Sequence, residues 1–208
     1  MNIYVEKFLN SNCAADILPL FTNYTQVSKR NKEISESMSC LDAALRYSGF
    51  DPKDPDVFCY VVGDGIRPRT GMLVAYFTQW NVLSIDPVLD MDWWENYHSF
   101  KANEGFAPQR LALFRRKIED MSLEENEKSV IILPHSHADL GATLVSIPGK
   151  SSIIELPCCT NFHDKLRSKK AVEHFGYMSY MDFDILSPKR TMHIWKNIDL
   201  DGYYSLIK

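Results

Sequence analysis

Short apolar runs that alternate with helix-like segments constrain the fold of this chain most. The runs are rich in β-branched residues, as is typical of strands buried on both faces, and they span 57–62 (VFCYVV), 81–87, 129–133 (SVIIL) and 151–157. Helical patterns lie before or between them, at 32–47, 70–80, after 137 and at about 163–175. Strands that alternate with helices usually pair in parallel, so the pattern predicts an α/β, Rossmann-like fold with helices on both faces of a mainly parallel sheet.

Four further segments complete the expected sheet and the helices that cover it. Residues 93–100 (WWENYHSF) suggest another strand, and residues 109–121 suggest an amphipathic helix with Leu111, Phe114 and Ile118 facing inward. Near the end of the sequence, 180–186 and 190–198 flank a short Ser-Pro-Lys connection. This spacing predicts an antiparallel hairpin at the edge of the sheet.

Length and composition favour one main domain. The 208 residues, 45% of them apolar and 24% charged, exclude a disordered chain, and the Pro- and Asp-rich turn at 51–56 divides a helical extension or lid (1–50) from the α/β domain (51–208). A net charge of −4 excludes a positive field over the whole molecule. Five cysteines without a C-x-x-C pair favour a reducing, cytoplasmic location, and with no long apolar run we expect no membrane partner.

Candidate ligand-binding residues follow the first two strands. Gly63, Asp64 and Gly65 form a turn that leads into a helix, and Asp86 ends the next strand 21 positions after Gly65. A glycine turn lets a ligand approach the backbone, and an acid at about this distance bonds the ribose hydroxyls in nucleoside-binding α/β folds. Arg67, beside the turn, could receive an anionic group. The alternative is a tight turn with solvated side chains.

The fourth strand leads into Pro134, His135, Ser136, His137 and Asp139. A neutral imidazole can accept a proton near pH 7, so His135 and His137 are candidate general bases. A second interpretation is a metal site, because H-x-H-x-D resembles the metal-binding loop of metallo-β-lactamase-like hydrolases, with further ligands available from Cys158, Cys159 and His163. That family has a second histidine where this chain has Leu140. A third is that the loop only caps the next helix.

Together these residues resemble the class I S-adenosylmethionine-dependent methyltransferases over about 40–200. The likeness is strongest to a methyltransferase-like branch that has a His- and Cys-containing loop after strand four and Cys-Cys after strand five, some members of which act on tRNA. It implies S-adenosylmethionine as cofactor. The turn at 63–65 would then face its methionine end, Asp86 its ribose, and the loop from Pro134 to Asp139 the sulfonium and the acceptor, and Arg67 is a further candidate for binding the cofactor.

One position departs from this family. An acid usually stands two places before the first glycine, and here that place holds Val61. A methyltransferase-like binding protein without activity is therefore the alternative to an enzyme. The acceptor is unidentified. RNA is a candidate because basic runs occur at 115–117 and 165–170, although such runs are usually solvated surfaces.

Overall fold

The computed structural model describes residues 2–22, 26–103, 110–157 and 164–208. In these ranges the strands are β1 (Phe58–Val62), β2 (Asn81–Ile85), β3 (Leu111–Phe114), β4 (Ser129–Pro134), β5 (Ser151–Leu156), β6 (Met178–Met181) and β7 (Thr191–Ile198). They form one sheet in the order β3-β2-β1-β4-β5-β7-β6. The first five strands are parallel, and β7 runs antiparallel to both β5 and β6. The expected Rossmann-like sheet with an antiparallel C-terminal pair is confirmed.

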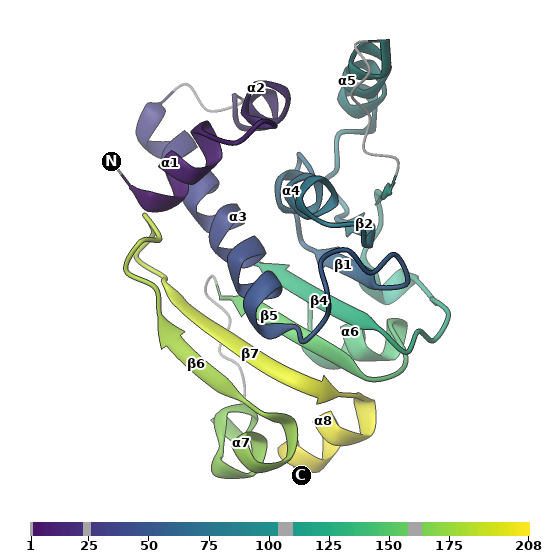
Figure 1. The fold of residues 1–208 in the computed structure, drawn as a ribbon. Coiled ribbons are helices and arrows are strands. Elements are labelled where there is room, and N and C mark those ends of the chain that lie inside the picture. The colour runs from purple at the N-terminus through teal and green to yellow at the C-terminus, as the bar shows by residue number, and fades with distance from the viewer. Residues whose placement is uncertain (1, 23–25, 104–109, 158–163) are drawn as a thin grey trace.

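Helices cover both faces of this sheet (Figure 1). One face carries α1 (Ile3–Leu9), α2 (Ala14–Ile17), the 3-10 turn η1 (Leu18–Phe21), α3 (Val27–Tyr47), α4 (Arg69–Phe77) and α5 (Met91–Asn103). The other carries η2 (Ile118–Asp120), α6 (Leu140–Ser146), η3 (Asp164–Arg167), α7 (Lys169–Phe175) and α8 (Leu200–Ile207). We call the two apolar layers beneath them the α3-side core and the α6-side core.

Strand β1 shows why a continuous apolar run forms a central strand. Successive side chains of a strand point to opposite faces, so Cys59 and Val61 enter the α3-side core while Tyr60 and Val62 enter the α6-side core. All four are at most 2% exposed. Such a strand is stable only when both of its faces are covered. This places β1 inside the sheet, between β2 and β4.

Two predictions of secondary structure are wrong: a predicted strand is part of a helix, and a predicted helix contains a strand. Residues 93–100 lie in α5 instead of a strand, because Trp94 and Tyr97, three positions apart, share one helix face and pack into the α3-side core. Of the amphipathic helix expected over 109–121, residue 109 lies outside the described residues, and 110–121 hold β3 and η2 instead. Backbone pairing with β2, in the register Val82 to Leu111, makes 111–114 a strand of the sheet.

The C-terminal part differs from expectation in three details. The first strand of the hairpin ends at Met181 and not at 186, because the Asp182 side chain turns the chain by accepting a hydrogen bond from the backbone of Asp184. The helix expected over 163–175 is divided into η3 and α7, and Ser168 caps the second piece by accepting from Ala171 N. Helix α8 follows β7 and was not expected.

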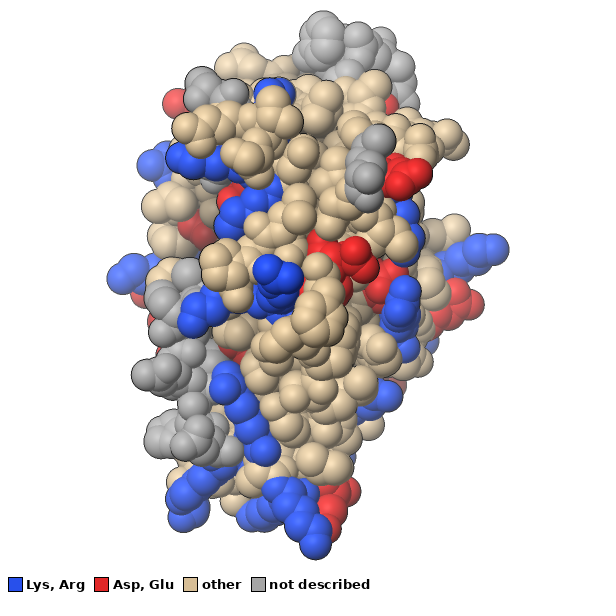
Figure 2. Space-filling model, turned by 90° about the vertical axis from the view of Figure 1, so that its left-hand side faces the viewer, with Lys and Arg blue, Asp and Glu red and all other residues tan. Residues whose placement is uncertain are grey.

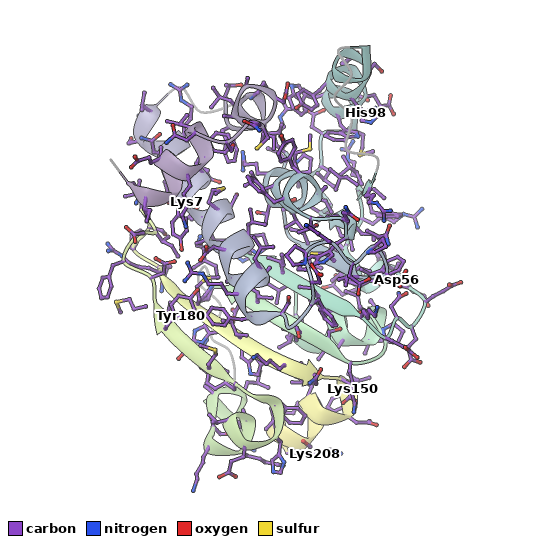
Figure 3. The ribbon with its side chains drawn as sticks, viewed as in Figure 1. Lys7, Asp56, His98, Lys150, Tyr180 and Lys208 are labelled. Atoms are coloured by element: carbon purple, nitrogen blue, oxygen red, sulfur yellow. The ribbon has the colours of Figure 1, made fainter. Side chains whose placement is uncertain are left out.

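The N-terminal helices are joined to the sheet by side-chain and backbone contacts. Tyr4 in α1 donates its hydroxyl to Asp182 after β6, and the backbone of Leu186 donates to Ser35 Oγ of α3 (2.9 Å). Tyr180 of β6, labelled in Figure 3, packs beside Tyr47 of α3 with ring centroids 5.7 Å apart. Helix α3 is thereby fixed against the sheet edge where β6 lies. Across the described ranges, no helix has the length and apolar character needed to span a bilayer.

Candidate functional site

A cleft of about 770 Å³ lies at the carboxyl ends of β1, β2 and β4. Its walls come from α3, the turn after β1, the ends of β2 and β4, the segment at 116–119 and the loop before β7. Figure 2 views the side toward which β4 and β5 run in Figure 1, and shows acidic side chains in the middle of that face with Lys and Arg around them. Ligands of open parallel sheets bind at this position.

The glycine turn approaches the loop after β4 closely. Gly63 has a φ of +83°, and a Cβ built on it would lie 2.6 Å from Ser136 Oγ, so a side chain at this position would both strain the backbone and collide with the loop. Gly65 has a φ of +80°, but a Cβ there would meet only Arg69 Nη1, at 3.9 Å. The first glycine therefore permits packing between two loops, while the second leaves space open in the cleft.

Asp86 lies against this turn. Its Oδ2 accepts a hydrogen bond from Gly65 N at 2.8 Å, and its Oδ1 accepts one from Val88 N at 2.9 Å. The side chain is 8% exposed and lines the cleft. Each carboxylate oxygen can accept a second hydrogen bond, so the group remains able to bind hydroxyl groups of a ligand.

Asp64 binds the protein itself. Its carboxylate accepts hydrogen bonds from Thr70 N (2.9 Å), Gly71 N (2.8 Å) and Ser84 Oγ (2.8 Å). Burial raises the pKa of Asp64 to about 6, although these donors and Arg69 lower it in part. The carboxylate thereby satisfies the first amides of α4 and ties that helix to β2. It also forms part of the cleft wall.

The two arginines beside the turn have different surroundings. Arg67 stacks on the Trp93 ring, with its guanidinium carbon 3.7 Å from the ring centroid, and lies 3.5 Å from an Asp90 oxygen. This contact attaches the turn to α5. Arg69 is buried, donates to the Leu20 carbonyl and pairs with Glu33 at 3.1 Å. Arg69 lines the cleft, whereas Arg67 faces α5.

The end of β4 brings Pro134 to the cleft wall, and the loop after it brings His135 and His137. His135 has a φ of +55°, an uncommon backbone conformation for a residue other than glycine, and its backbone N donates to the Leu156 carbonyl of β5. Asp139 caps α6 by accepting from Ala142 N at 2.8 Å. No group of three His, Cys, Asp or Glu side chains suited to a metal ion occurs in the described parts of the chain. The proposed extra ligands Cys158, Cys159 and His163 lie outside those parts.

Sequence reasoning missed the acidic side chains of α3. Glu36 Oε1 lies 2.7 Å from His135 Nε2, and Lys32 Nζ lies 2.8 Å from the same oxygen. Burial alone would raise the pKa of Glu36, but contact with His135 and Lys32 outweighs it and holds the pKa below its ordinary value. A sequence signal exists, because Glu33, Glu36 and Ser37 recur at helical spacing on α3 and all line the cleft.

The basic runs lie at two separate places. Lys165 donates to the carbonyls of Ile207 and Lys208, and Lys170 donates to that of Ser205, so these two side chains hold the end of α8. Residues 116–117, in contrast, are exposed and line the cleft. The run at 165–170 therefore has a structural use, and the run at 115–117 adjoins the candidate site.

Comparison with known proteins gives matches by structure only. No protein-family model matches the sequence, and neither does any curated protein. Magnesium protoporphyrin IX methyltransferase from Synechocystis PCC 6803 with bound SAH has a TM-score of 0.54 at 7% identity, covering 94% of this chain and 97% of that one. The same enzyme with bound SAM gives 0.52 at 9% identity, covering 92% and 95%.

The chain has the fold of S-adenosylmethionine-dependent methyltransferases. A 16S rRNA (adenine(1408)-N(1))-methyltransferase from Catenulisporales acidiphilia also matches, with a TM-score of 0.48 at 12% identity over 73% of this chain and 97% of that one. At these identities the likeness concerns the fold, and the functional assignment depends on the side chains in the cleft.

Proposed function

We propose that this chain is a methyltransferase that binds S-adenosylmethionine in the cleft and transfers its methyl group to a hydroxyl or amine acceptor. The observation that carries the proposal is the hydrogen bond between Gly65 N and Asp86, which joins the ends of β1 and β2 inside a cleft of about 770 Å³. The turn at Gly65, which would bind the methionine end of the cofactor, and the Asp86 carboxylate, which would bind its ribose, therefore lie on the same wall of the cleft.

The residues present fit this cofactor at two points. The space above Gly65 is open, since a Cβ there would meet a single atom at 3.9 Å, and both oxygens of Asp86 keep capacity for ribose hydroxyls. Gly63, Asp64 and Pro134 complete the wall on either side. Val61 fits less well, because its side chain is buried in the α3-side core where relatives would present an acid.

S-adenosylmethionine, when bound, supplies an activated methyl group on its sulfonium. The chain itself must then orient the acceptor and remove its proton. His135 and His137 line the cleft, and either imidazole, when neutral, can accept that proton near pH 7. The cations at 116–117 and Lys189 on the cleft wall suit an acceptor with anionic groups, so RNA remains our candidate acceptor.

We also propose that residues 1–50 act as the extension that closes the cleft over its acceptor side. Lys32, Glu33 and Glu36 of α3 support this division, since they form part of the wall and not only of the core. A reducing, cytoplasmic location belongs to the same proposal. It is supported by Cys13, Cys40 and Cys59, which are buried free thiols.

Calorimetry with S-adenosylmethionine and S-adenosylhomocysteine tests the function. We expect saturable heat with the wild type and none with Gly65→Arg, whose side chain would fill the open space. Gly65→Ala is the matched control, because it carries the same backbone strain at a φ of +80° without filling the cleft. It should keep binding, weakened by at most about tenfold, the equivalent of about 1.4 kcal/mol.

Absence of heat with the wild type at millimolar ligand would refute the enzyme. It would support the alternative that Val61 suggests, which is a methyltransferase-like binding protein without activity. Equal loss of binding in Gly65→Ala and Gly65→Arg would show that the turn matters for folding and not for the ligand.

A further inference from the structure

We propose that the loop between β6 and β7, residues 182–190, binds single-stranded RNA, with Phe183 stacked on one base and Lys189 and Arg190 at the neighbouring phosphates. The choice of ligand rests on the proposed function, since RNA is the candidate acceptor of the cleft. The loop would hold that acceptor at the edge of the cleft. RNA binding can be measured without the cofactor, so the two proposals can fail separately.

Phe183 projects from a turn that is held on both sides. The ring is 74% exposed, more than any other large apolar side chain in the described ranges. Next to it, Asp182 accepts hydrogen bonds from the Tyr4 hydroxyl and from Asp184 N, and Ile185 is fully buried in the α3-side core. The turn is therefore fixed while its ring faces solvent. An exposed aromatic ring is the group on which bases of single-stranded nucleic acids stack.

A small pocket of about 240 Å³ lies beside this ring. Its volume is below the range of about 300–1,000 Å³ for pockets that enclose a drug-sized ligand. The pocket therefore suits one planar group of a larger molecule. Apolar side chains contribute to its lining together with Phe183, namely Pro157, Met181 and Pro188.

The charges at this pocket favour an anionic ligand. Its described lining includes two cations, Lys189 and Arg190, and no acid. Arg190 Nε donates to the Ser187 carbonyl at 3.0 Å, which holds the guanidinium within the loop, and Lys189 is exposed. Asp184 is an exposed acid of the same loop but is not part of that lining. Cations beside an aromatic ring match the phosphates and the base of a nucleotide, and this combination favours RNA over an apolar protein surface.

The pocket adjoins the cleft. Lys189 lines both of them, and Ser187 lines the cleft. The loop lies on the side of the molecule toward which β4 and β5 run (Figure 1). A strand whose base stacks on Phe183 can therefore pass Lys189 and bring another nucleotide into the cleft. Phe183 thus binds a base that flanks the methylated nucleotide.

Fluorescence anisotropy with a labelled oligouridine of about 12 nucleotides tests the stacking role in the full chain. Phe183→Ala should raise the Kd by about tenfold, which is within the range for loss of one base–aromatic stack. Phe183→Trp should keep the wild-type Kd, and Phe183→Leu, which stays apolar, should weaken binding. Phe77→Ala is the matched control, because Phe77 is an exposed ring at the end of α4 and is absent from the described lining of both pockets.

Titration at salt concentrations between about 50 and 200 mM tests the charged contact. Lys189→Gln should weaken binding and reduce the slope of log Kd against log salt by about one, as expected for one lost phosphate contact. Lys150→Gln removes the same charge from an exposed lysine just before β5, labelled in Figure 3, and should change neither quantity.

Two results would overturn the proposal: no binding of the oligouridine by the wild type, or an equal Kd for Phe183→Ala and the wild type. Self-association in light scattering that Phe183→Ala abolishes, with RNA binding unchanged, would assign the ring to a second copy of the chain and would also overturn it. Calorimetry with S-adenosylmethionine should give the same heat for Phe183→Ala and the wild type. A wild type without cofactor heat that still binds RNA through Phe183 refutes the function and supports the RNA site.

Discussion

Two buried carboxyl groups, one in the turn after β1 and one in β5, differ in their support. Asp64 accepts three hydrogen bonds from backbone and side-chain donors, whereas Glu155 Oε2 has no hydrogen-bond partner among the described residues. Burial raises the pKa of both, to about 6 for Asp64 and about 8 for Glu155. Donors aimed at a carboxylate thus offset much of the cost of burying its charge, and a neighbouring cation alone, Arg167 for Glu155, offsets less.

The two carboxyl groups also lie in different parts of the molecule. Asp64 belongs to the cleft wall, while Glu155 lies opposite His193 on the neighbouring strand β7. Burial lowers the pKa of His193 to about 4, and its Nδ1 lies 2.9 Å from the Tyr177 hydroxyl. This second cluster is built into the sheet, so we expect it to affect stability and not ligand binding.

The sharpest test makes the same isosteric change in both carboxyl groups. At pH 7, Asp64→Asn should lower the free energy of unfolding by about 2–3 kcal/mol, because an amide nitrogen replaces an acceptor and leaves a buried donor unsatisfied. Glu155→Gln should instead raise it, by about 3 kcal/mol, because at pH 7 the wild-type carboxyl group must take up a proton on folding and an amide needs none. Urea unfolding at pH 7 measures both, and equal losses would contradict the comparison.

The pH dependence of stability gives the next largest effect. The native chain keeps the proton of Glu155 up to about pH 8, while the unfolded chain releases it near 4.5, so stability is lost as pH rises through this window. Between pH 4 and 6.5 the titration of His193 offsets this loss of stability, because its imidazole is protonated in the unfolded chain and neutral in the native chain. Above 6.5 we expect a fall of about 1.4 kcal/mol per pH unit up to pH 8.

Glu155→Gln should abolish that fall, which thermal unfolding at pH 6.5, 7.25 and 8 would measure. Asp64→Asn should retain it, because Asp64 titrates near 6. A decline that survives in Glu155→Gln would assign it to another group.

The smallest effect concerns the hydroxyl of Tyr177. Tyr177→Phe removes one hydrogen bond to His193 and should lower the free energy of unfolding by about 1 kcal/mol. Heat of S-adenosylmethionine binding should be the same as in the wild type. A change in that heat would mean that the cluster of Glu155, His193 and Tyr177 is energetically coupled to the cleft. The separation of the two regions would then be wrong.

The central strands could be predicted because burial on both faces leaves a readable pattern. In β1, every residue from Cys59 to Val62 is buried, and no amphipathic helix has four consecutive apolar positions of this kind without exposing one. The segments at 93–100 and 111–114 could not be read this way. The first has aromatic residues that favour strands yet share a helix face, and the second is a short strand whose pairing with β2 decides its structure.

The candidate site was predictable only where its residues directly follow a predicted strand. The turn at 63–65 and the loop at 134–139 follow strands directly, so their convergence follows from a parallel sheet. Glu36 could not be placed, because its contact with His135 joins α3 to β4 across a long sequence separation. The use of Asp64 as an acceptor for α4 also required coordinates, since its residue type suits a ligand as well as a cap.

The last strand of the sheet lies inside it, between β5 and β6. During synthesis β5 therefore has no neighbour on that side until Thr191–Ile198 has left the ribosome. A nascent chain of this length presents an open strand edge, which is the feature that chaperones shield and that promotes aggregation. The sheet is completed only when the strand that carries His193 pairs beside Glu155.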